Sequence, residues 1–345
     1  MMAKKNLEID FALQGGGSHG AFAWGVLDRF LEEDWLDVLG IAGTSAGSMN
    51  AAVFASGYAV GGKEGAREAL NHFWKKVSDG AIFSPFKRSP LDILQGKWTL
   101  DNSPLFLLAE LTSRVMSPYD NPFKGENPLK SILEDSVDFS AIHNGPIKLF
   151  INATNVRTGR GRVFRTKEIT PEVLMASACL PTLFPAVEID GEAYWDGGYS
   201  GNPMLTSLIR EVDSMDTILV QINPVERPGI PKTAGEIMNR LNEISFNSSL
   251  LKELRMLSLI ADAVPESNQM GQSGLCGGQR MHLIGNEIMV QLGHSSKLNA
   301  EWEFLSMLKE EGRKSAETFL KMNGNKLGKE STFDKASLQE GIDYV

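Results

Sequence analysis

The sequence predicts an α/β fold with a mostly parallel central sheet and helices on both of its faces. Two observations lead to this prediction. The first is that residues 7–57 alternate strand and helix patterns in the order strand, helix, strand, helix, and such a unit places its strands in parallel. The second is that short apolar runs, typical of buried strands, return at 147–156 and 217–224.

The opening unit is clear in the residues themselves. LEIDFAL at 7–13 alternates large apolar side chains with polar or small ones, as a strand does. The glycine run GGGSHG at 15–20 leads into AFAWGVLDRFLEED at 21–34, whose large apolar residues share one helical face. DVLGIA at 37–42 is a buried-strand pattern that ends in GTSAG at 43–47, after which small apolar residues begin a second helix.

The later strand patterns lie between residues 147 and 224. IKLFINATNV at 147–156 and VFRT at 163–166 are expected to continue the parallel sheet. VEIDGEAYWDGG at 187–198 predicts a hairpin with an Asp190-Gly191 turn. TILVQINP at 217–224 predicts one more buried strand, which a proline ends.

One large domain, residues 1–322, accounts for most of the 345 residues. Residues 78–128 are rich in proline and aromatic side chains and predict an insertion, which is either a lid over a site or a plain connection. From about residue 234 the pattern is helical, at 234–262 and again at 301–321. The last residues, 323–345, are polar and predict a flexible tail.

Composition and charge exclude several classes of protein. The formal net charge is −9 and Lys and Arg form no stripe, so we expect no general nucleic-acid binding. The two cysteines, Cys179 and Cys276, are far apart and have no CxxC partner, which predicts no disulfide framework. Neither a signal peptide nor an apolar run of about 18 residues is present, which favours a cytoplasmic protein, peripheral to membranes at most. We expect no metal and no organic cofactor, because HExxH, clustered Cys/His and EF-hand patterns do not occur.

The glycine run could in principle bind a nucleotide, but its surroundings argue against this. Gly15, Gly17 and Gly20 fit the GxGxxG pattern between a strand and a helix. A dinucleotide site also needs an acidic residue near the end of the second strand, and that strand ends in IAGT. No GK[ST] follows the glycines, which excludes a P-loop.

The GTSAG stretch fits a different chemistry, acyl transfer by an activated serine. It places Ser45 between a buried strand and a helix, which is the context of a nucleophile elbow. Side chains two residues before and after the serine would clash in such a sharp turn, and Gly43 and Gly47 remove that clash. Three consecutive glycines can turn their N–H groups toward the oxyanion that forms when a serine attacks a carbonyl. They are Gly15, Gly16 and Gly17.

The base that activates Ser45 is less evident from the residues alone. Five histidines are present, none with a local signature: His19, His72, His143, His282 and His294. The first of them follows the glycine run and could simply face solvent. Asp196 ends a predicted strand and precedes two glycines in WDGG, which suits either a positioned base or an ordinary Asp-Gly turn.

Three stretches together resemble the patatin-like phospholipase family: GGGSHGAFAWG, GTSAG and SACLPTLFPAVEIDGEAYWDGG. The resemblance covers residues 7–57 and 147–223 and implies a patatin-like three-layer α/β/α sandwich. It also implies a Ser-Asp dyad without histidine, with Ser45 as the nucleophile, Asp196 as the base and the three glycines as the oxyanion loop.

Two consequences of the resemblance concern single residues. The family often has Arg or Lys where this chain has His19, so a side-chain role of His19 stays open. An ordinary aspartate is a weak base, with a pKa near 3.9, and burial beside Trp195 would raise the pKa of Asp196.

From these features we expect a lipid acyl hydrolase of phospholipase A or lysophospholipase type that works through an acyl-enzyme. The same dyad would serve a carboxylesterase or an intracellular polyester depolymerase, because the elbow does not select the acyl group. A catalytically silent lipid-binding scaffold is a third hypothesis, which the intact Ser45 and Asp196 disfavour. Transient contact with a membrane is expected through three aromatic residues of the insertion: Phe83, Phe86 and Trp98.

Overall fold

The structure, a computed structural model, has one central sheet with helices on both sides. It describes residues 6–82, 84, 86–113, 115–120, 127–263 and 278–333. Three predictions fall outside these ranges: membrane contact by Phe83, the unpaired state of Cys276, and the end of the polar tail at 334–345.

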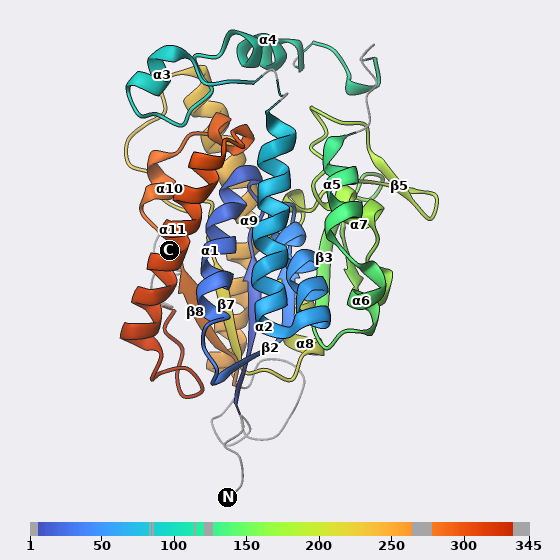
Figure 1. The fold of residues 1–345 in the computed structure, drawn as a ribbon, viewed down its shortest axis with the longest axis vertical. Helices are drawn as coiled ribbons and strands as arrows, with labels where there is room; N and C mark the ends of the chain where they lie inside the picture. Colours follow the sequence, from blue (N-terminus) through green and yellow to red (C-terminus); the bar gives the residue numbers. More distant parts are fainter. Residues whose placement is uncertain are drawn as a thin grey trace, which may run out of the picture.

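Eight strands form the sheet in the described part of the chain (Figure 1). They are β1 (Leu7–Leu13), β2 (Leu36–Gly43), β3 (Lys148–Asn155), β4 (Gly161–Arg165), β5 (Val187–Ile189), β6 (Glu192–Asp196), β7 (Asp216–Val220) and β8 (Arg280–Ile284). Their order is β5-β6-β3-β2-β1-β7-β8, and β4 also pairs with β3. The five strands from β3 to β8 in this order are parallel, which confirms the predicted mostly parallel sheet.

The strand pattern at 163–166 belongs to β4, which pairs antiparallel with β3. The expectation that it continues the parallel sheet is therefore wrong. Only residues 156–160 connect the two strands, and a parallel crossover needs a dozen residues or more. The predicted hairpin is confirmed, because β5 and β6 are antiparallel and the turn residues Asp190 and Gly191 have φ of 54° and 78°.

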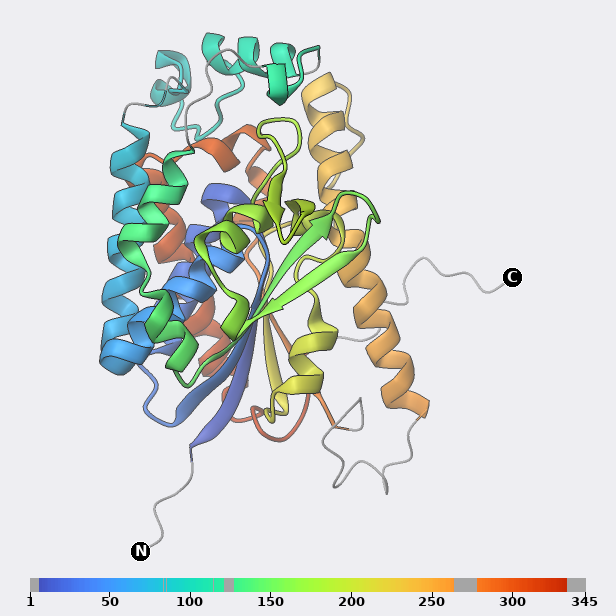
Figure 2. The same cartoon turned by 90° about the vertical axis from the view of Figure 1, so that its right-hand side faces the viewer.

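Helices cover both faces of the sheet (Figure 2), which confirms the three-layer α/β/α sandwich. One face carries α1 (Gly20–Phe30), α2 (Ala46–Ala81), α5 (Pro128–Ser136), α6 (Phe139–Asn144), α7 (Pro171–Ser177) and α11 (Trp302–Asn323). The other carries α8 (Leu205–Glu211) and α9 (Ala234–Ala263). Successive side chains of β1 point to opposite faces of the sheet and so contribute to two hydrophobic cores. Phe11 packs with the first set of helices and Ala12 with the second.

The C-terminal helix α11 packs closely against the first helix of the chain. A Cβ on Gly25 of α1 would come within 1.9 Å of the Lys309 carbonyl oxygen, and one on Gly312 within 2.1 Å of the Phe22 carbonyl oxygen. These two glycines allow the helix backbones to touch. The end of the described chain is thus part of the same core as its beginning.

The proline- and aromatic-rich insertion forms a layer above the carboxyl ends of the parallel strands (Figure 1). It contains α3 (Pro90–Leu94) and α4 (Pro104–Ser113). Phe86 packs against Phe106, with ring centroids 6.0 Å apart, and Trp98 stacks on Phe304 at 5.1 Å beneath the Arg88 guanidinium. Both rings are half-buried and have partners within the protein, and contact of Phe86 and Trp98 with a membrane stays a prediction.

Aliphatic side chains are exposed on this layer. Six of them, which we call the aliphatic surface, are more than half exposed: Leu91, Ile93, Leu94, Leu105, Leu108 and Leu111. They come from α3 and α4.

The first part of the polar tail is attached to the sheet. Leu327 is buried, and the Gly328 N–H donates to the Asp216 carboxylate at 3.0 Å. The N–H groups of Thr332 and Phe333 lie 3.1 and 3.0 Å from the Met281 carbonyl oxygen on β8. This differs from the flexible tail expected from composition, because one buried leucine and a few backbone hydrogen bonds hold residues 327–333.

Candidate active site

The carboxyl ends of β2 and β6 face each other along one edge of β3. β2 runs parallel to β3 up to the Gly43–Ile151 pair, and β6 runs antiparallel down to the Asp196–Ala153 pair. β4 occupies the other edge of β3 along both stretches, so β2 and β6 must share this one. A single residue of β3, Asn152, separates the two strand ends. The residue that ends β6 and the loop that follows β2 therefore meet, although about 150 residues separate them in sequence.

Ser45 lies in the turn from β2 into α2, and its backbone is strained. Its φ and ψ are 53° and −122°, a region that few residues other than glycine adopt. Its N–H donates to the Ser177 hydroxyl at 2.9 Å, and its side chain is 8% exposed. The serine that the GTSAG motif singled out thus has the conformation of a nucleophile elbow, at the amino end of a long helix.

The two elbow glycines have the close contacts that the motif predicts. A Cβ on Gly43 would lie 2.5 Å from the Gly47 carbonyl oxygen, and one on Gly47 would lie 2.2 Å from the Leu13 carbonyl oxygen. Both distances are shorter than real Cβ contacts, so any larger residue must displace backbone. The elbow and the end of β1 are packed together at this point.

Asp196 is an acidic group that accepts a hydrogen bond from the Ser45 hydroxyl. It is 1% exposed, and its Oδ1 accepts the Gly198 N–H at 2.7 Å. Burial raises the pKa of Asp196 from 3.8 to about 6, while the Gly198 N–H, a hydrogen bond from the Ser45 hydroxyl and the charge of Lys297 oppose this rise. Among the described residues no cation forms an ion pair with it. A buried carboxylate of this kind is a stronger base than an exposed one and is still mostly ionised at neutral pH.

The glycine run is held by two asparagines that sequence reasoning missed. The Gly15 N–H donates to Asn202 Oδ1 at 2.6 Å, and the Gly15 carbonyl oxygen accepts from Asn223 Nδ2 at 2.7 Å. The Gly15 N–H is therefore not available to an oxyanion, contrary to expectation. The N–H groups of Gly16 and Gly17 donate to no group in the part of the chain that the structure describes.

Gly15 contributes by its lack of a side chain. A Cβ at this position would lie 2.6 Å from the Ser45 Cβ. The glycine run and the elbow are therefore in direct contact at the carboxyl edge of β1 and β2, as the parallel pairing of these strands predicts.

Two further polar residues hold the strand ends in place. Asn152 Nδ2 donates to the carbonyl oxygens of Gly197 and Gly201 at 2.7 and 2.8 Å. The Ser177 hydroxyl donates to the Asn152 carbonyl oxygen at 2.7 Å while accepting the Ser45 N–H. The signal that could have found Asn152 is a polar residue at a buried position of the apolar run IKLFINATNV.

No histidine interacts with Ser45 or Asp196 among the described residues. His19, which could have faced solvent, is buried, and its Nε2 lies 2.8 Å from the Ser296 hydroxyl. His282 contacts Asp216 on β7, away from the elbow. The base expected from the resemblance, Asp196, is thus the titratable group that the structure brings to Ser45.

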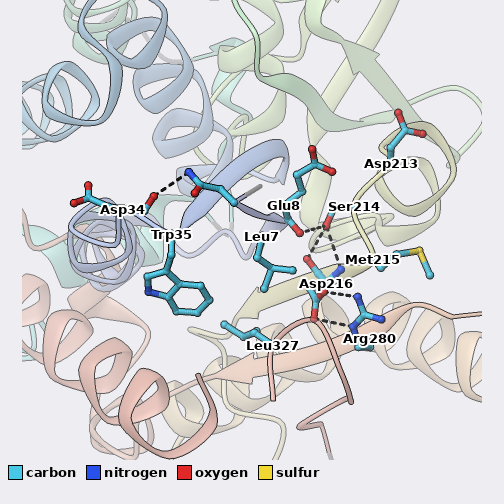
Figure 3. Close-up of a pocket in the computed structure, with 11 residues that line it drawn as sticks. Leu7, Glu8, Asp34, Trp35, Asp213, Ser214, Met215, Asp216, Arg280 and Leu327 are labelled. Atoms are coloured by element: carbon cyan, nitrogen blue, oxygen red, sulfur yellow. Dashed lines mark hydrogen bonds and ion pairs between the residues drawn. The ribbon is translucent and has the colours of Figure 1, made fainter. Parts of the chain in front are cut away.

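A cavity of about 820 Å³ lies at the opposite, amino end of the parallel strands (Figure 3). Its lining includes Leu7, Trp35 and Met215 together with the ion pair between Arg280 and Asp216. Neither Ser45, Asp196 nor any residue of the glycine run lines it. The Arg280 guanidinium in this lining is paired with the Asp216 carboxylate at 2.6 Å.

Two searches of the described residues bear on other kinds of site. No group of three or more His, Cys, Asp or Glu side chains in these residues could hold a metal ion. No helix among them is long and apolar enough to cross a bilayer.

Comparison with known proteins adds a family assignment. A family model described as "Patatin-like phospholipase" matches residues 11–209, more than half of the chain, and this stretch includes both Ser45 and Asp196. No individually curated protein matches the chain.

Two solved structures are similar at low levels. VipD from Legionella pneumophila is 14% identical, with 93% of this chain and 67% of that chain covered and a TM-score of 0.42. The second is the complex of SpcU with ExoU from the type III secretion system of Pseudomonas aeruginosa. It is 17% identical, with 77% of this chain and 60% of that chain covered and a TM-score of 0.30. The chain thus spans about two thirds of the length of these proteins, and likeness at this level carries no argument about function.

Proposed function

Because this chain belongs to the patatin-like phospholipase family, a family of lipid hydrolases, we propose that it cleaves fatty-acyl esters of phospholipids or lysophospholipids. Ser45 is the nucleophile, Asp196 the general base, and the N–H groups of Gly16 and Gly17 form the oxyanion hole. Gly15, Gly43 and Gly47 make room for the elbow. Residues 1–322 act as one catalytic domain, which the packing of α11 on α1 supports.

One observation carries this proposal. A strained serine at the end of β2 meets a buried aspartate at the end of β6, and the pKa of that aspartate is raised to about 6 by burial. Strained backbone and unpaired buried charge are both unfavourable for folding, and they concentrate where chemistry requires them.

Acylation begins when the Asp196 carboxylate accepts the proton of the Ser45 hydroxyl as Oγ attacks the ester carbonyl carbon. The carbonyl oxygen becomes an oxyanion, which the Gly16 and Gly17 N–H groups stabilise, each by about 2.7–4 kcal/mol if they resemble known oxyanion donors. The bond to the alcohol then breaks, and Asp196 gives its proton to the departing oxygen. The products of this half are the free alcohol and an acyl ester on Ser45.

Deacylation repeats these steps with water. Asp196 accepts a proton from the water that attacks the acyl carbonyl, and the oxyanion returns to the same two N–H groups. The bond to Ser45 Oγ breaks, the serine oxygen takes the proton back from Asp196, and the fatty acid leaves. A single carboxylate therefore serves both halves, and its pKa near 6 suits a group that must accept and return protons near neutral pH.

The aliphatic surface supports contact with a lipid layer. Its six side chains are contributed by the two helices that lie above the carboxyl ends of the strands (Figure 1), on the side of the sheet where Ser45 lies. Exposed apolar patches of this kind mark interaction sites. Docking through α3 and α4 would present the edge of the sheet that carries the elbow to the membrane.

The activity is tested by fatty-acid release from a panel of phospholipid, lysophospholipid and neutral esters, measured by mass spectrometry. Wild type is compared with Ser45→Ala, each with and without a chelator. Release by wild type alone, unaffected by the chelator, supports a metal-independent serine hydrolase and identifies its substrate class. Release from short soluble esters but from no lipid would favour a carboxylesterase, and no release at all would favour a lipid-binding scaffold.

Membrane contact is tested by sedimentation with phosphatidylcholine vesicles. Leu94→Glu combined with Leu111→Glu should reduce binding and spare hydrolysis of a soluble ester. Met322→Glu is the matched control, because it alters an equally exposed apolar side chain at the far end of α11. Equal binding by both proteins would contradict docking through the aliphatic surface.

A further inference from the structure

The short helical segment η6 (Ser295–Leu298) lies against the glycine loop, although it is outside the family-matched residues 11–209. The Lys297 carbonyl oxygen would lie 2.4 Å from a Cβ on Gly17, so the two backbones are in contact. The neighbouring Ser296 hydroxyl lies 2.8 Å from His19 Nε2. This segment therefore packs directly against the glycine loop.

The Lys297 side chain reaches toward the same loop. Its Nζ donates to Asn223 Oδ1 at 2.8 Å, and Asn223 Nδ2 in turn donates to the Gly15 carbonyl oxygen at 2.7 Å. An ammonium group has three N–H donors, and this is the one hydrogen bond it makes among the described residues. It forms no ion pair with any described carboxylate.

None of the charged groups around Lys297 that the structure describes forms an ion pair with its ammonium group. Burial lowers the pKa of Lys297 to about 8, Glu243 and Asp196 oppose this, and Arg227 adds to it. Glu243 is already held by Arg227, with Nη2 2.6 Å from Oε1, and by Arg240. His19 and His294 also face this charge, and burial keeps both of their pKa values low, so they are neutral near pH 7.

We propose that Lys297 is a specificity-determining residue, which binds the phosphate of a glycerophospholipid while Ser45 attacks the neighbouring acyl ester. This rests on the proposed function above. In such a lipid the phosphate is separated from the nearer acyl ester by two glycerol carbons, so a cation close to the dyad can reach it. A lysine ammonium is a common point-charge ligand for phosphate. A neutral acylglycerol offers no such anion, so Lys297 favours phosphate-bearing lipids over neutral ones.

The test compares two short-chain substrates that stay monomeric and carry the same acyl chains, dihexanoylphosphatidylcholine and dihexanoylglycerol. Lys297→Met should lower kcat/KM for the phospholipid by about 10- to 100-fold, mostly through KM, if it removes one charge-assisted contact. For the neutral lipid the change should stay within about 3-fold. Lys297→Arg should restore part of the loss, and Lys75→Met controls for removal of a surface charge.

A pH profile gives a second readout. Phospholipid hydrolysis by wild type should fall as the pH rises through about 8, where Lys297 loses its proton, and hydrolysis of the neutral lipid should not. The alkaline fall should disappear in Lys297→Arg, because an arginine stays charged.

Several outcomes would overturn the proposal. An equal loss on both substrates in Lys297→Met would mean that Lys297 only holds the glycine loop through Asn223. An unchanged phospholipid rate would mean that it binds no phosphate.

Binding to the Ser45→Ala protein separates this proposal from the proposed function, because it needs no turnover. Titration calorimetry with dihexanoylphosphatidylcholine should show binding that Lys297→Met in the same background weakens, whereas dihexanoylglycerol binding is unaffected. Sodium phosphate that binds as tightly as the phospholipid would assign the site to free phosphate and reject the lipid. Absence of ester cleavage by wild type would reject the proposed function and leave this binding result to judge Lys297.

Discussion

Two buried aspartates at opposite ends of one sheet have opposite chemistry. Asp196 ends β6 at the elbow, is 1% exposed and has no cation as an ion-pair partner among the described residues; its pKa is raised to about 6. Asp216 begins β7 at the amino end, is 0% exposed and lies 2.6 Å from an Arg280 nitrogen and 2.9 Å from His282. Burial opposes its charge as well, but these partners lower its pKa to about 2.

The difference shows that burial alone does not make a carboxylate reactive. Asp216 has its charge neutralised by partners, so its ionised form stabilises the fold and holds the chain at Gly328. Asp196 forms no ion pair with any residue that the structure describes, so burial destabilises its ionised form and raises its pKa. The paired charges at one end of the sheet stabilise the protein, and the strained and unpaired groups at the other end are those that the proposed reaction would use.

The largest expected effect is the loss of the nucleophile. Ser45→Ala should reduce hydrolysis of a soluble ester by at least about 10⁴-fold, as removal of a catalytic serine does in other hydrolases. The free energy of unfolding should fall by no more than about 1.5 kcal/mol, because only the hydroxyl and its hydrogen bond to Asp196 are lost. Ser214→Ala, a buried serine at the amino end, is the control and should retain activity.

Replacement of each aspartate by asparagine should change stability in opposite directions. Asp216→Asn leaves Arg280 and His282 without their anion and should lower the free energy of unfolding by about 3 kcal/mol. Asp196→Asn removes a buried charge and should raise it at pH 7, by up to about 3 kcal/mol for a pKa shift of roughly two units. Urea denaturation at pH 7 measures both.

The direction of each pKa shift also determines how the stability contribution of that aspartate depends on pH. The pKa of Asp196 is raised in the folded state, so its penalty is absent below about pH 4 and complete above about pH 6. The pKa of Asp216 is lowered, so its contribution is present above about pH 4 and lost as the pH falls toward 2. Equal shifts of the same sign in the two variants would contradict the contrast between the two sites.

A methyl group at the elbow should affect both stability and activity. Gly47→Ala places a Cβ 2.2 Å from the Leu13 carbonyl oxygen and should lower the free energy of unfolding by about 1–3 kcal/mol, as overpacking does. Gly61→Ala is the control, since a Cβ there has open space and its φ is −134°. The midpoint temperatures of thermal unfolding measure the difference between the two variants. Equal midpoints would contradict the close packing of the elbow.

The smallest effect concerns the pH profile of the wild type. If Asp196 must be ionised to accept the serine proton, kcat/KM for a neutral soluble ester should fall about tenfold per pH unit below pH 6. A profile that is flat from pH 5 to 8 would show that a different group limits the reaction.

The sequence predicted correctly those features that depend on residues close together in the chain. The elbow of Ser45 and the Asp190-Gly191 hairpin follow from short motifs, because turn geometry is decided within a few residues. The direction of β4 was missed, although the short link after β3 decides it.

Long-range contacts could not be predicted in this way. Asn202 binds Gly15 across 187 residues, and Lys297 reaches Asn223 across 74, so no local pattern marks either of them. The packing of Phe86 and Trp98 within the protein was missed for a similar reason. An aromatic side chain suits a core and a membrane surface equally well until its tertiary neighbours are known.

The central claim is that Asp196, and not the better-paired Asp216, is the catalytic base. The most direct measurement is hydrolysis of one soluble ester by Asp196→Asn and Asp216→Asn, at a temperature where circular dichroism shows both to be folded. We expect Asp196→Asn to lose at least about 10³-fold, as loss of a catalytic base does, and Asp216→Asn to keep most of the wild-type rate. Activity of Asp196→Asn within about tenfold of wild type would contradict the claim and place the base elsewhere.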